Sequence, residues 1–229
     1  ITSMRQKPWR SLFYLDLMAG PGKNIFSPSR EVMLGSPLIA LTARYAFTHY
    51  RFVEAGSNEF AALKTRVSSS ERVTDVQIWN DDCNIVVDQI IEEIMAIDRE
   101  HIRDRWSSLN LAFLDPEGLE LNWSTVEKLG KVNRMDLIIN FSTSGFTRNV
   151  DQMIKKGQTR TLDEFFGTQE WQEVYKRVAD RDATHVRRAM LDFYKERLAK
   201  LGYHFNREHE IVEPVFQNRK RVQIYTLMF

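Results

Sequence analysis

A pair of glycines after the first strongly apolar run marks the first place where chemistry could occur. Residues 12–17 form a continuous apolar run apart from Asp16, and Ala19-Gly20-Pro21-Gly22 follows it. Because glycine has no Cβ, a ligand can approach the backbone closely at such a turn. The pattern indicates a buried strand followed by a binding turn for a small anionic or nucleoside-like ligand. A tight turn without a ligand is the alternative.

The glycine turn does not match two common phosphate-binding motifs. A dinucleotide-binding GxGxxG motif would need a third glycine where this chain has Ile25, and Glu54 lies farther on than the usual spacing of about 20 residues. A phosphate loop would need Gly-Lys-Ser/Thr after the first glycine, and this segment has none. NAD and NTP binding are therefore disfavoured.

Acidic residues follow the next two predicted strands. Glu54 ends a strand that begins at Tyr50, and Asp82 follows a strand over residues 73–79. Because the carboxyl ends of parallel strands share one edge of a sheet, we expect both side chains at the same crevice. The first carboxylate would suit ribose hydroxyls, and the second an adenine amino group. Solvated acids at loop starts are the alternative, and Asp81 competes with Asp82 for the second role.

Asp115 and Pro116 follow a predicted strand over residues 109–114, and the proline stiffens the turn. The Asp115 carboxylate and the Pro116 carbonyl would suit the N–H groups of an amine, holding its lone pair toward an electrophile. Asn140, near the end of a predicted strand over residues 135–141, would help to line the pocket. A turn or capping role for Asp115 and a structural role for Asn140 are the alternatives.

Strand-type apolar runs alternate with helical patterns, which predicts an α/β sandwich with a mostly parallel, seven-stranded sheet and a C-terminal antiparallel hairpin. Ser36 is predicted to cap the first helix with Pro37 at its first position, and Gly202 to end the last helix. The expected strands are residues 12–17, 50–54, 73–79, 109–114, 135–141, 209–215 and 222–229, and the expected helices are 38–47, 85–97, 169–178 and 185–201.

Length and composition predict one soluble globular domain over residues 1–229, because 229 residues with 43% hydrophobic side chains can bury a substantial core. No apolar run reaches the roughly 20 residues of a membrane span. Cys83 is the one cysteine, so a disulfide within the chain or a cysteine-ligated zinc is excluded and a cytoplasmic location is expected. The five histidines show no paired metal spacing, and no metal is assigned. Since the chain lacks an initial Met and stops inside an apolar run, we expect it to extend beyond both ends.

The charge distribution is asymmetric. Residues 54–125 are mainly acidic and residues 176–221 mainly basic. A nucleic acid could contact the basic part, although a solvated helix surface explains it as well. A second candidate contact for nucleic acid combines an aromatic residue with cations after the fifth predicted strand: Phe146, Arg148, Lys155, Lys156 and Arg160.

Short motifs spread over nearly the whole chain stand in an order typical of one known family. They are Asp16-Leu17-Met18-Ala19-Gly20-Pro21-Gly22, the segment 35–41 (GSPLIAL), Asp82-Cys83-Asn84, Phe113-Leu114-Asp115-Pro116, the segment 136–141 (DLIINF), the segment 162–167 (LDEFFG) and Leu201-Gly202-Tyr203. This set resembles the three-Cys-motif partner (TcmP) family of class I, Rossmann-like S-adenosylmethionine-dependent methyltransferase-like proteins. Members are often encoded beside a radical-type protein with three cysteines, which the resemblance implies as a partner.

The resemblance also implies S-adenosylmethionine as the ligand and assigns roles to individual residues. Ala19, Gly20 and Gly22 would lie against the methionine moiety with Asp16 ordering their loop, Glu54 would bind the ribose, and Asp82 with Cys83 beside it would lie at the adenine. Two departures stand out. Glu117 and Gly118 follow Pro116 where nucleobase methyltransferases usually have a second proline and an aromatic residue, and residues 23–35 separate the glycine turn from its helix. That insertion is expected to be a lid or a substrate loop.

The sequence therefore predicts a methyltransferase acting on a nucleic acid or nucleotide-type amine. A non-catalytic cofactor-binding scaffold that works with a partner and a nucleic-acid-binding module are the two alternatives.

Overall fold

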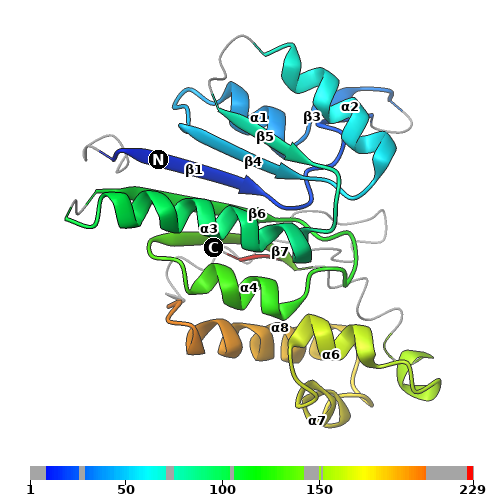
Figure 1. Cartoon of the computed structure of the whole chain (residues 1–229). Helices are drawn as coiled ribbons and strands as arrows, with labels where there is room; N and C mark the ends of the chain where they lie inside the picture. Colours follow the sequence, from blue (N-terminus) through cyan, green and yellow to red (C-terminus); the bar gives the residue numbers. More distant parts are fainter. Residues whose placement is uncertain are drawn as a thin grey trace. The chain divides into compact units, whose positions relative to one another are not determined.

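The computed structural model describes residues 9–25, 29–70, 75–103, 106–141, 150, 152–204 and 226–228. Within them the chain is an α/β protein with a mostly parallel sheet (Figure 1). The strand order is β5-β4-β1-β6-β7-β8, with β1 parallel to β4 and β6, β4 parallel to β5, and β7 antiparallel to β8. The strands are β1 (Ser11–Asp16), β4 (His49–Val53), β5 (Val76–Trp79), β6 (Ser108–Leu114), β7 (Met135–Phe141) and β8 (Thr226–Met228).

The predicted parallel sheet is confirmed, whereas seven strands and a terminal hairpin are not shown. The expected strand 209–215 and the turn after it lie outside the described residues, and of the expected strand 222–229 only β8 is described. A short antiparallel pair, β2 (Lys23–Ile25) and β3 (Val32–Leu34), was not expected from the sequence. No helix in the described part of the chain is long and apolar enough to cross a membrane.

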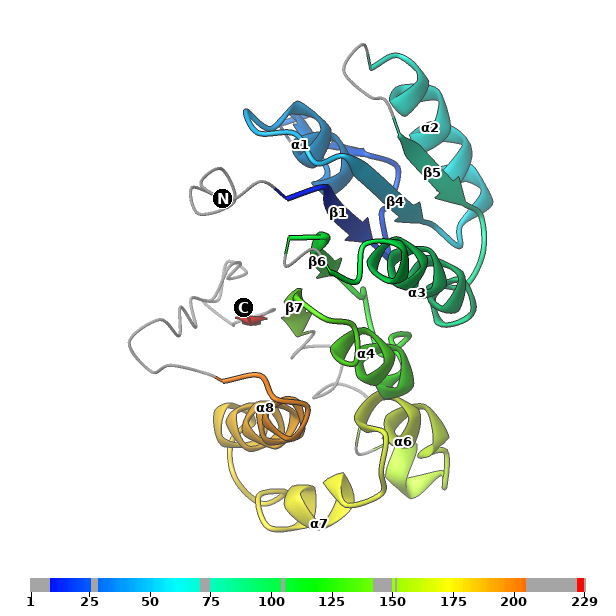
Figure 2. The same ribbon diagram turned by 60° about the vertical axis from the view of Figure 1, so that its left-hand side comes forward.

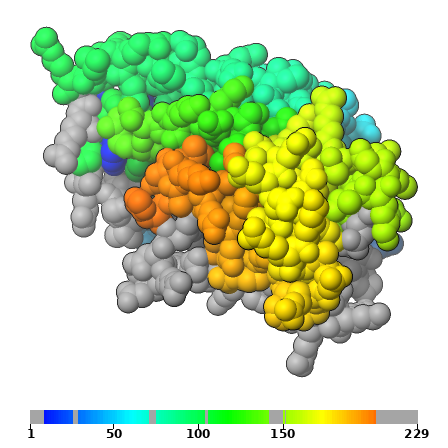
Figure 3. Space-filling model, turned by 90° about the horizontal axis from the view of Figure 1, so that it is seen from below, coloured from blue at the N-terminus to red at the C-terminus, as the bar shows by residue number. Residues whose placement is uncertain are grey.

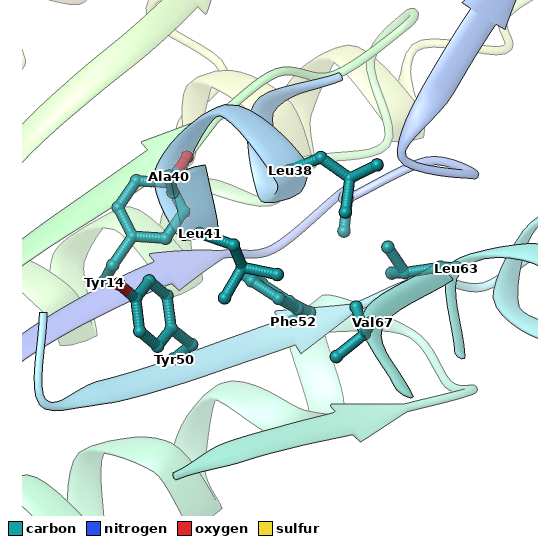
Figure 4. Close-up of a cluster of buried hydrophobic side chains, with 9 residues drawn as sticks. Tyr14, Leu38, Ala40, Leu41, Tyr50, Phe52, Leu63 and Val67 are labelled. Atoms are coloured by element: carbon teal, nitrogen blue, oxygen red, sulfur yellow. The ribbon is translucent and has the colours of Figure 1, made fainter. Parts of the chain in front are cut away.

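The chain divides into two compact units, Ile1–Leu114 with Val132–Leu137, and Asp115–Lys131 with Ile138–Phe229. In unit 1, helices α1 (Ser36–Thr42) and α2 (Ser57–Ser68) pack against one face of the strands, and α3 (Cys83–Glu100) packs against the other (Figure 2). The core beneath α1 and α2 is shown in Figure 4, and it consists of Tyr14, Ala19, Leu38, Ala40, Leu41, Tyr50, Phe52, Leu63 and Val67. These side chains fix the two helices over β1 and β4.

The first helix differs from the prediction at both ends. Gly35, rather than Ser36, is the N-cap, because its backbone is extended while its carbonyl accepts a hydrogen bond from Ile39 N at 3.0 Å. The Gly35 N–H donates to Gly22 O at 2.8 Å. The helix ends at Thr42 instead of residue 47, since the Phe47 ring leaves it to pack against Tyr14 at 5.3 Å between ring centroids. Tertiary packing therefore shortens a segment whose local pattern favours a longer helix.

A fully buried arginine lies on the opposite face of β4, toward α3. Arg51 has no exposed surface, and its guanidinium donates to Asp75 at 2.9 and 3.1 Å and to Glu93 at 2.7 Å from Nε. Burial lowers the pKa of Arg51, but the two carboxylates outweigh this and raise it. The His49 ring stacks on the Phe13 ring beside this cluster, with 4.3 Å between the ring centroids. The cluster joins β1, β4, α3 and the residue before β5.

Unit 2 contains α4 (Trp123–Gly130), α6 (Arg160–Phe166), α7 (Trp171–Lys176) and α8 (Ala183–Lys200). Helices α7 and α8 lie side by side, and the space-filling view shows their surface (Figure 3). The core of this unit is aromatic: Tyr194 of α8 has no exposed surface and contacts Trp123, Phe141, Phe165 and Phe166. Gly202 has φ +96°, which confirms the predicted stop after the last helix.

The LDEFFG motif is explained by packing within this unit. Leu162, Phe165 and Phe166 are buried. Asp163 accepts a hydrogen bond from Trp171 Nε1 at 2.7 Å. Gly167 has φ +66° at the end of α6, and a Cβ there would overlap the Trp123 indole. This motif is therefore a structural one.

Gly167 and Gly157 form a matched pair for testing this packing. Gly157 has φ +65°, and none of the residues with described positions has an atom within 4 Å of the place that its Cβ would take, so we expect Gly157→Ala to add backbone strain alone. We expect it to lower the free energy of unfolding by about 1–2 kcal/mol, and Gly167→Ala to cost a further ~1–3 kcal/mol from overpacking. Urea denaturation of both variants measures the difference. Equal losses would show that Trp123 does not constrain Gly167.

Candidate functional site

The glycine turn after β1 is held in place by four backbone-directed hydrogen bonds. Ala19 N donates to Val53 O at 2.9 Å, and Gly20 N donates to Glu54 Oε2 at 2.7 Å. The carbonyl of Pro21 accepts a hydrogen bond from Arg66 Nη1 of α2, and Gly22 O accepts the one from Gly35 N described above. The turn is therefore preorganised by β4, α2 and the start of α1.

The two glycines of the turn differ in what surrounds them. Gly22 has φ +78°, and a Cβ there would lie 3.1 Å from Leu63 and 3.2 Å from Leu38, so packing as well as conformation favours glycine. Gly20 has φ +61°, and no atom of a described residue lies within 4 Å of the position that its Cβ would take. Glycine at this position leaves the backbone open to a ligand, and contact with one stays a prediction.

Glu54 lies directly after β4 and receives two backbone amides. Besides the bond from Gly20, its Oε1 accepts from Gly56 N at 2.7 Å. Asn80 Nδ2 fixes the same backbone from the side of β5 by donating to the carbonyls of Glu54 at 2.9 Å and Ala55 at 3.1 Å. A carboxylate oxygen can accept more than one hydrogen bond, so Glu54 retains acceptor capacity for a diol while it anchors the loop.

The remaining cofactor candidates of unit 1 are less directly supported. Asp16 ends β1 with no exposed surface, and its Oδ2 accepts from Tyr14 Oη at 3.4 Å. Asp82 is the exposed N-cap of α3 and accepts from Asn84 N at 2.8 Å, so helix capping accounts for its type. Cys83 is buried in the first turn of that helix. Their contacts with a cofactor stay predictions.

In unit 2 the structure brings two of the predicted catalytic residues into contact. Asn140 Nδ2 donates a hydrogen bond to Asp115 Oδ1 at 2.6 Å. Because a carboxylate only accepts, the Asn140 amide must direct its nitrogen toward Asp115 and its oxygen away. Asn140 Oδ1 is shielded from solvent and has no hydrogen-bond partner among the described residues.

The turn after Asp115 is closed locally. Pro116 is buried, and Glu120 accepts backbone N–H groups of Glu117 and Gly118, the latter at 2.8 Å. Burial raises the pKa of Asp115, the Asn140 hydrogen bond lowers it, and the nearby Glu120 carboxylate adds to the rise. The net effect is a pKa above the usual value of 3.8.

Removing the amide donor tests the electrostatics of this pair. Asn140→Leu keeps a similar side-chain volume but deletes the hydrogen bond to the ionised carboxylate, so the pKa of Asp115 should rise further. Asp115 in the variant then ionises at a higher pH than it does in the intact protein. A ¹³C-carboxyl titration by NMR, with Asp115→Asn to identify the signal, measures both values. An unchanged or lower pKa in Asn140→Leu would contradict the assigned contact.

The insertion between the glycine turn and α1 contains the β2–β3 ribbon and exposes four apolar side chains. Their exposed fractions are 71% for Ile25, 61% for Val32, 50% for Met33 and 42% for Leu34. The hydrogen bond between Gly35 and Gly22 closes the base of the ribbon. A lid or substrate-loop role stays a prediction.

The predicted basic cluster is described only in part. Phe146 and Arg148 lie outside the described residues, whereas Lys155, Lys156 and Arg160 are exposed. Arg160 Nε forms an ion pair with Glu164 at 2.8 Å. No group of three or more His, Cys, Asp or Glu side chains suited to a metal ion occurs among the residues with described positions.

Sequence reasoning missed three residues that shape the glycine turn: Gly56, Arg66 and Asn80. Gly56 precedes a helix, which is a usable signal. Arg66 and Asn80 act through contacts with residues 45 and 26 positions away, respectively, and no local pattern marks them.

No family model matches the chain, and no curated protein matches it. Two solved structures show a limited similarity to the chain. A conserved hypothetical protein from Streptococcus pyogenes is 16% identical, with 62% of this chain and 75% of that chain covered and a TM-score of 0.36. The protein LPL1258 from Legionella pneumophila, described under the family DUF519, is 14% identical, with 68% of each chain covered and a TM-score of 0.44. Similarities of this size carry no argument about fold or activity. The chain's own sheet topology establishes it as an α/β protein with a mostly parallel sheet.

Proposed function

We propose that this chain is an S-adenosylmethionine-dependent methyltransferase of the class I, TcmP-like type, located in the cytoplasm. Its substrate is an amine of a nucleic acid or nucleotide, and a radical-type protein with three cysteines is its partner. The observation that carries the proposal is the open space above Gly20 next to the anchored Glu54 carboxylate. The motif resemblance supplies the identity of the ligand.

The residues around the glycine turn fit the chemical groups of that cofactor. The Gly20 backbone has room for the methionine part, and Glu54 offers acceptors for ribose hydroxyls at the carboxyl end of β4. Ligands of open α/β sheets bind at this edge, next to the strand where the connections change direction, which is β1 in this sheet. When bound, the cofactor supplies an electrophilic methyl group.

The chemistry assigned to unit 2 is positioning of the amine. The Asp115 carboxylate and the Pro116 carbonyl accept its N–H groups, and the negative charge on Asp115 favours the cation that develops on nitrogen. This charge requires an ionised Asp115. Methyl transfer should therefore decline on acidification through the raised pKa of this group.

Gly20→Ala tests the cofactor site, with Gly157→Ala as the control for backbone strain. Both positions have nearly the same positive φ, +61° and +65°, and open space around the added Cβ. We expect similar losses of stability, but only Gly20→Ala should weaken S-adenosylhomocysteine binding, by roughly tenfold or more, because its methyl group enters the ligand space. Isothermal titration calorimetry measures the affinities. Absence of binding heat from the intact protein at millimolar ligand would refute the cofactor assignment.

Substitutions at Glu54 and Asp115 should separate cofactor binding from methyl transfer. Glu54→Ala should mainly weaken cofactor affinity, whereas Asp115→Ala should retain it within a few fold and lose methyl transfer by roughly 100-fold, as expected for a contact made mainly in the transition state. Transfer of radiolabelled methyl groups to DNA, RNA, protein and small-molecule pools identifies the substrate and supplies the assay. Unimpaired transfer by Asp115→Ala would remove its catalytic role.

A non-catalytic scaffold is the second candidate, and the turn after Pro116 favours it. Glu117 and Gly118 occupy the place where a stacking aromatic residue would be expected, and Glu120 closes that turn. The scaffold predicts cofactor binding without label transfer to any pool. A nucleic-acid-binding module predicts steep salt dependence of nucleic-acid affinity and no requirement for Gly20.

A further inference from the structure

Two carboxylates lie side by side at the start of α2, next to the glycine turn. Glu59, in the first turn of that helix, folds back so that its Oε2 overlaps the position that a Cβ on Gly56 would take, and Glu54 Oε1 lies 3.0 Å from the same position. The two oxygens therefore border one point. The Gly56 backbone has φ −71° and ψ 116°, which any residue can adopt, so glycine provides space here rather than a special conformation.

The hydrogen bonds around Gly56 leave the Glu59 carboxylate with unused acceptors. A glutamate at the third position of a helix commonly accepts the N–H of the N-cap residue. In this chain the Gly56 N–H donates to Glu54 instead, at 2.7 Å, and no side chain caps α2 by a hydrogen bond. Among the residues with described positions, no donor is bonded to the Glu59 carboxylate, which is exposed to solvent. Glu59 is therefore accessible to a ligand at this edge of the sheet.

Two neighbouring carboxylates restrict the groups that can bind between them. A phosphate would be repelled and a carbonyl would meet only acceptors, whereas a vicinal diol supplies two adjacent O–H donors. Each Glu54 oxygen already accepts one backbone amide, so a second carboxylate gives each hydroxyl an acceptor of its own. Calcium typically takes roughly six to eight oxygen ligands, and the described part of the chain offers no group of three or more suited side chains. The chemistry of the pair thus favours a diol.

We infer that Glu59 is a second ribose-binding residue, with Glu54 accepting a hydrogen bond from one hydroxyl of the diol and Glu59 accepting one from the other. This inference rests on the proposed methyltransferase and adds a specificity-determining residue to its cofactor site. Gly56 is then glycine because a Cβ would displace Glu59 from the diol. A phosphate on either hydroxyl is excluded by the two negative charges, and a deoxyribose leaves one carboxylate without its donor.

Nucleosides that differ by one hydroxyl test the role of Glu59 in the full chain. Adenosine has both ribose hydroxyls, whereas 2′-deoxyadenosine and 3′-deoxyadenosine each lack one. Each is titrated against the intact protein, Glu59→Gln and Glu173→Gln, and binding is followed by the NMR shifts of the Gly20 and Gly56 amides. Glu59→Gln preserves the size of the side chain. Glu173→Gln removes another carboxylate from the first turn of a helix, α7, and controls for net charge.

We expect Glu59→Gln to weaken adenosine binding by roughly five- to tenfold, because one hydrogen bond loses its charged acceptor. The deoxynucleoside that lacks the hydroxyl bound by Glu59 should lose less than about twofold, whereas the other should lose as much as adenosine does. Glu173→Gln should leave all three affinities unchanged. In a Gly56→Ala background, where the Cβ displaces the Glu59 carboxylate, Glu59→Gln should have no further effect.

Equal losses for all three nucleosides in Glu59→Gln would overturn the inference, because Glu59 would then act through its charge or through the helix. Unchanged affinities in that variant would also overturn it. A third contrary result is a saturable shift of the Gly56 amide with calcium chloride and none with adenosine, which would place a cation between the carboxylates.

Titration with S-adenosylhomocysteine separates this inference from the proposed function. If S-adenosylhomocysteine does not bind but the nucleosides still discriminate, the methyltransferase proposal fails and the diol site stands. If it binds the intact protein and Glu59→Gln equally well, only the role of Glu59 fails. If neither S-adenosylhomocysteine nor adenosine binds the intact protein, both fail.

Discussion

The buried charge of Arg51 strongly constrains the arrangement of unit 1. Its guanidinium has no access to water and depends on Asp75 before β5 and Glu93 in α3. Leaving such a charge without one partner typically costs about 3–5 kcal/mol. The native arrangement of β4, β5 and α3 therefore has to bring both carboxylates to Arg51.

The burial of Arg51 affects the candidate site because it fixes the register of β4. Successive side chains of a strand point to opposite faces, so placing Arg51 toward α3 places Tyr50 and Phe52 in the core under α1 and α2. A shift by one residue would bury the wrong side chains on both faces. With the register fixed, the strand ends at Val53 and Glu54 emerges at the edge, where it receives the amides of Gly20 and Gly56. The position of the glycine turn thus depends on the strand register that the Arg51 salt-bridge cluster helps to fix.

Strand β1 and the helix α3 could be predicted from local patterns, because their apolar residues are the buried ones. The apolar run at residues 12–17 became β1 (Ser11–Asp16), and the helix expected over residues 85–97 became Cys83–Glu100 once Asp82 capped it. The end of α1 and the β2–β3 ribbon depend instead on long-range contacts. Phe47 shortened α1, and the bond between Gly35 and Gly22 created a ribbon of two three-residue strands that are too short for a periodic signal.

The candidate site was predictable as a set of residue types at strand ends but not as a set of contacts. That Glu54 would hold Gly20 from 34 positions away, or Asn140 hold Asp115 from 25, has no local signature. Packing now accounts for several residues of the family-like motifs, among them Gly22, Asp163 and Gly167.

Gly20 and Asn140 differ from those residues. The positive φ of Gly20 already favours glycine, as at Gly157, while an acceptor of Asn140 has no partner among the described residues. Natural sequences depart from locally consistent choices mainly at functional sites. We therefore propose these two positions as the first places to look for contact with a ligand.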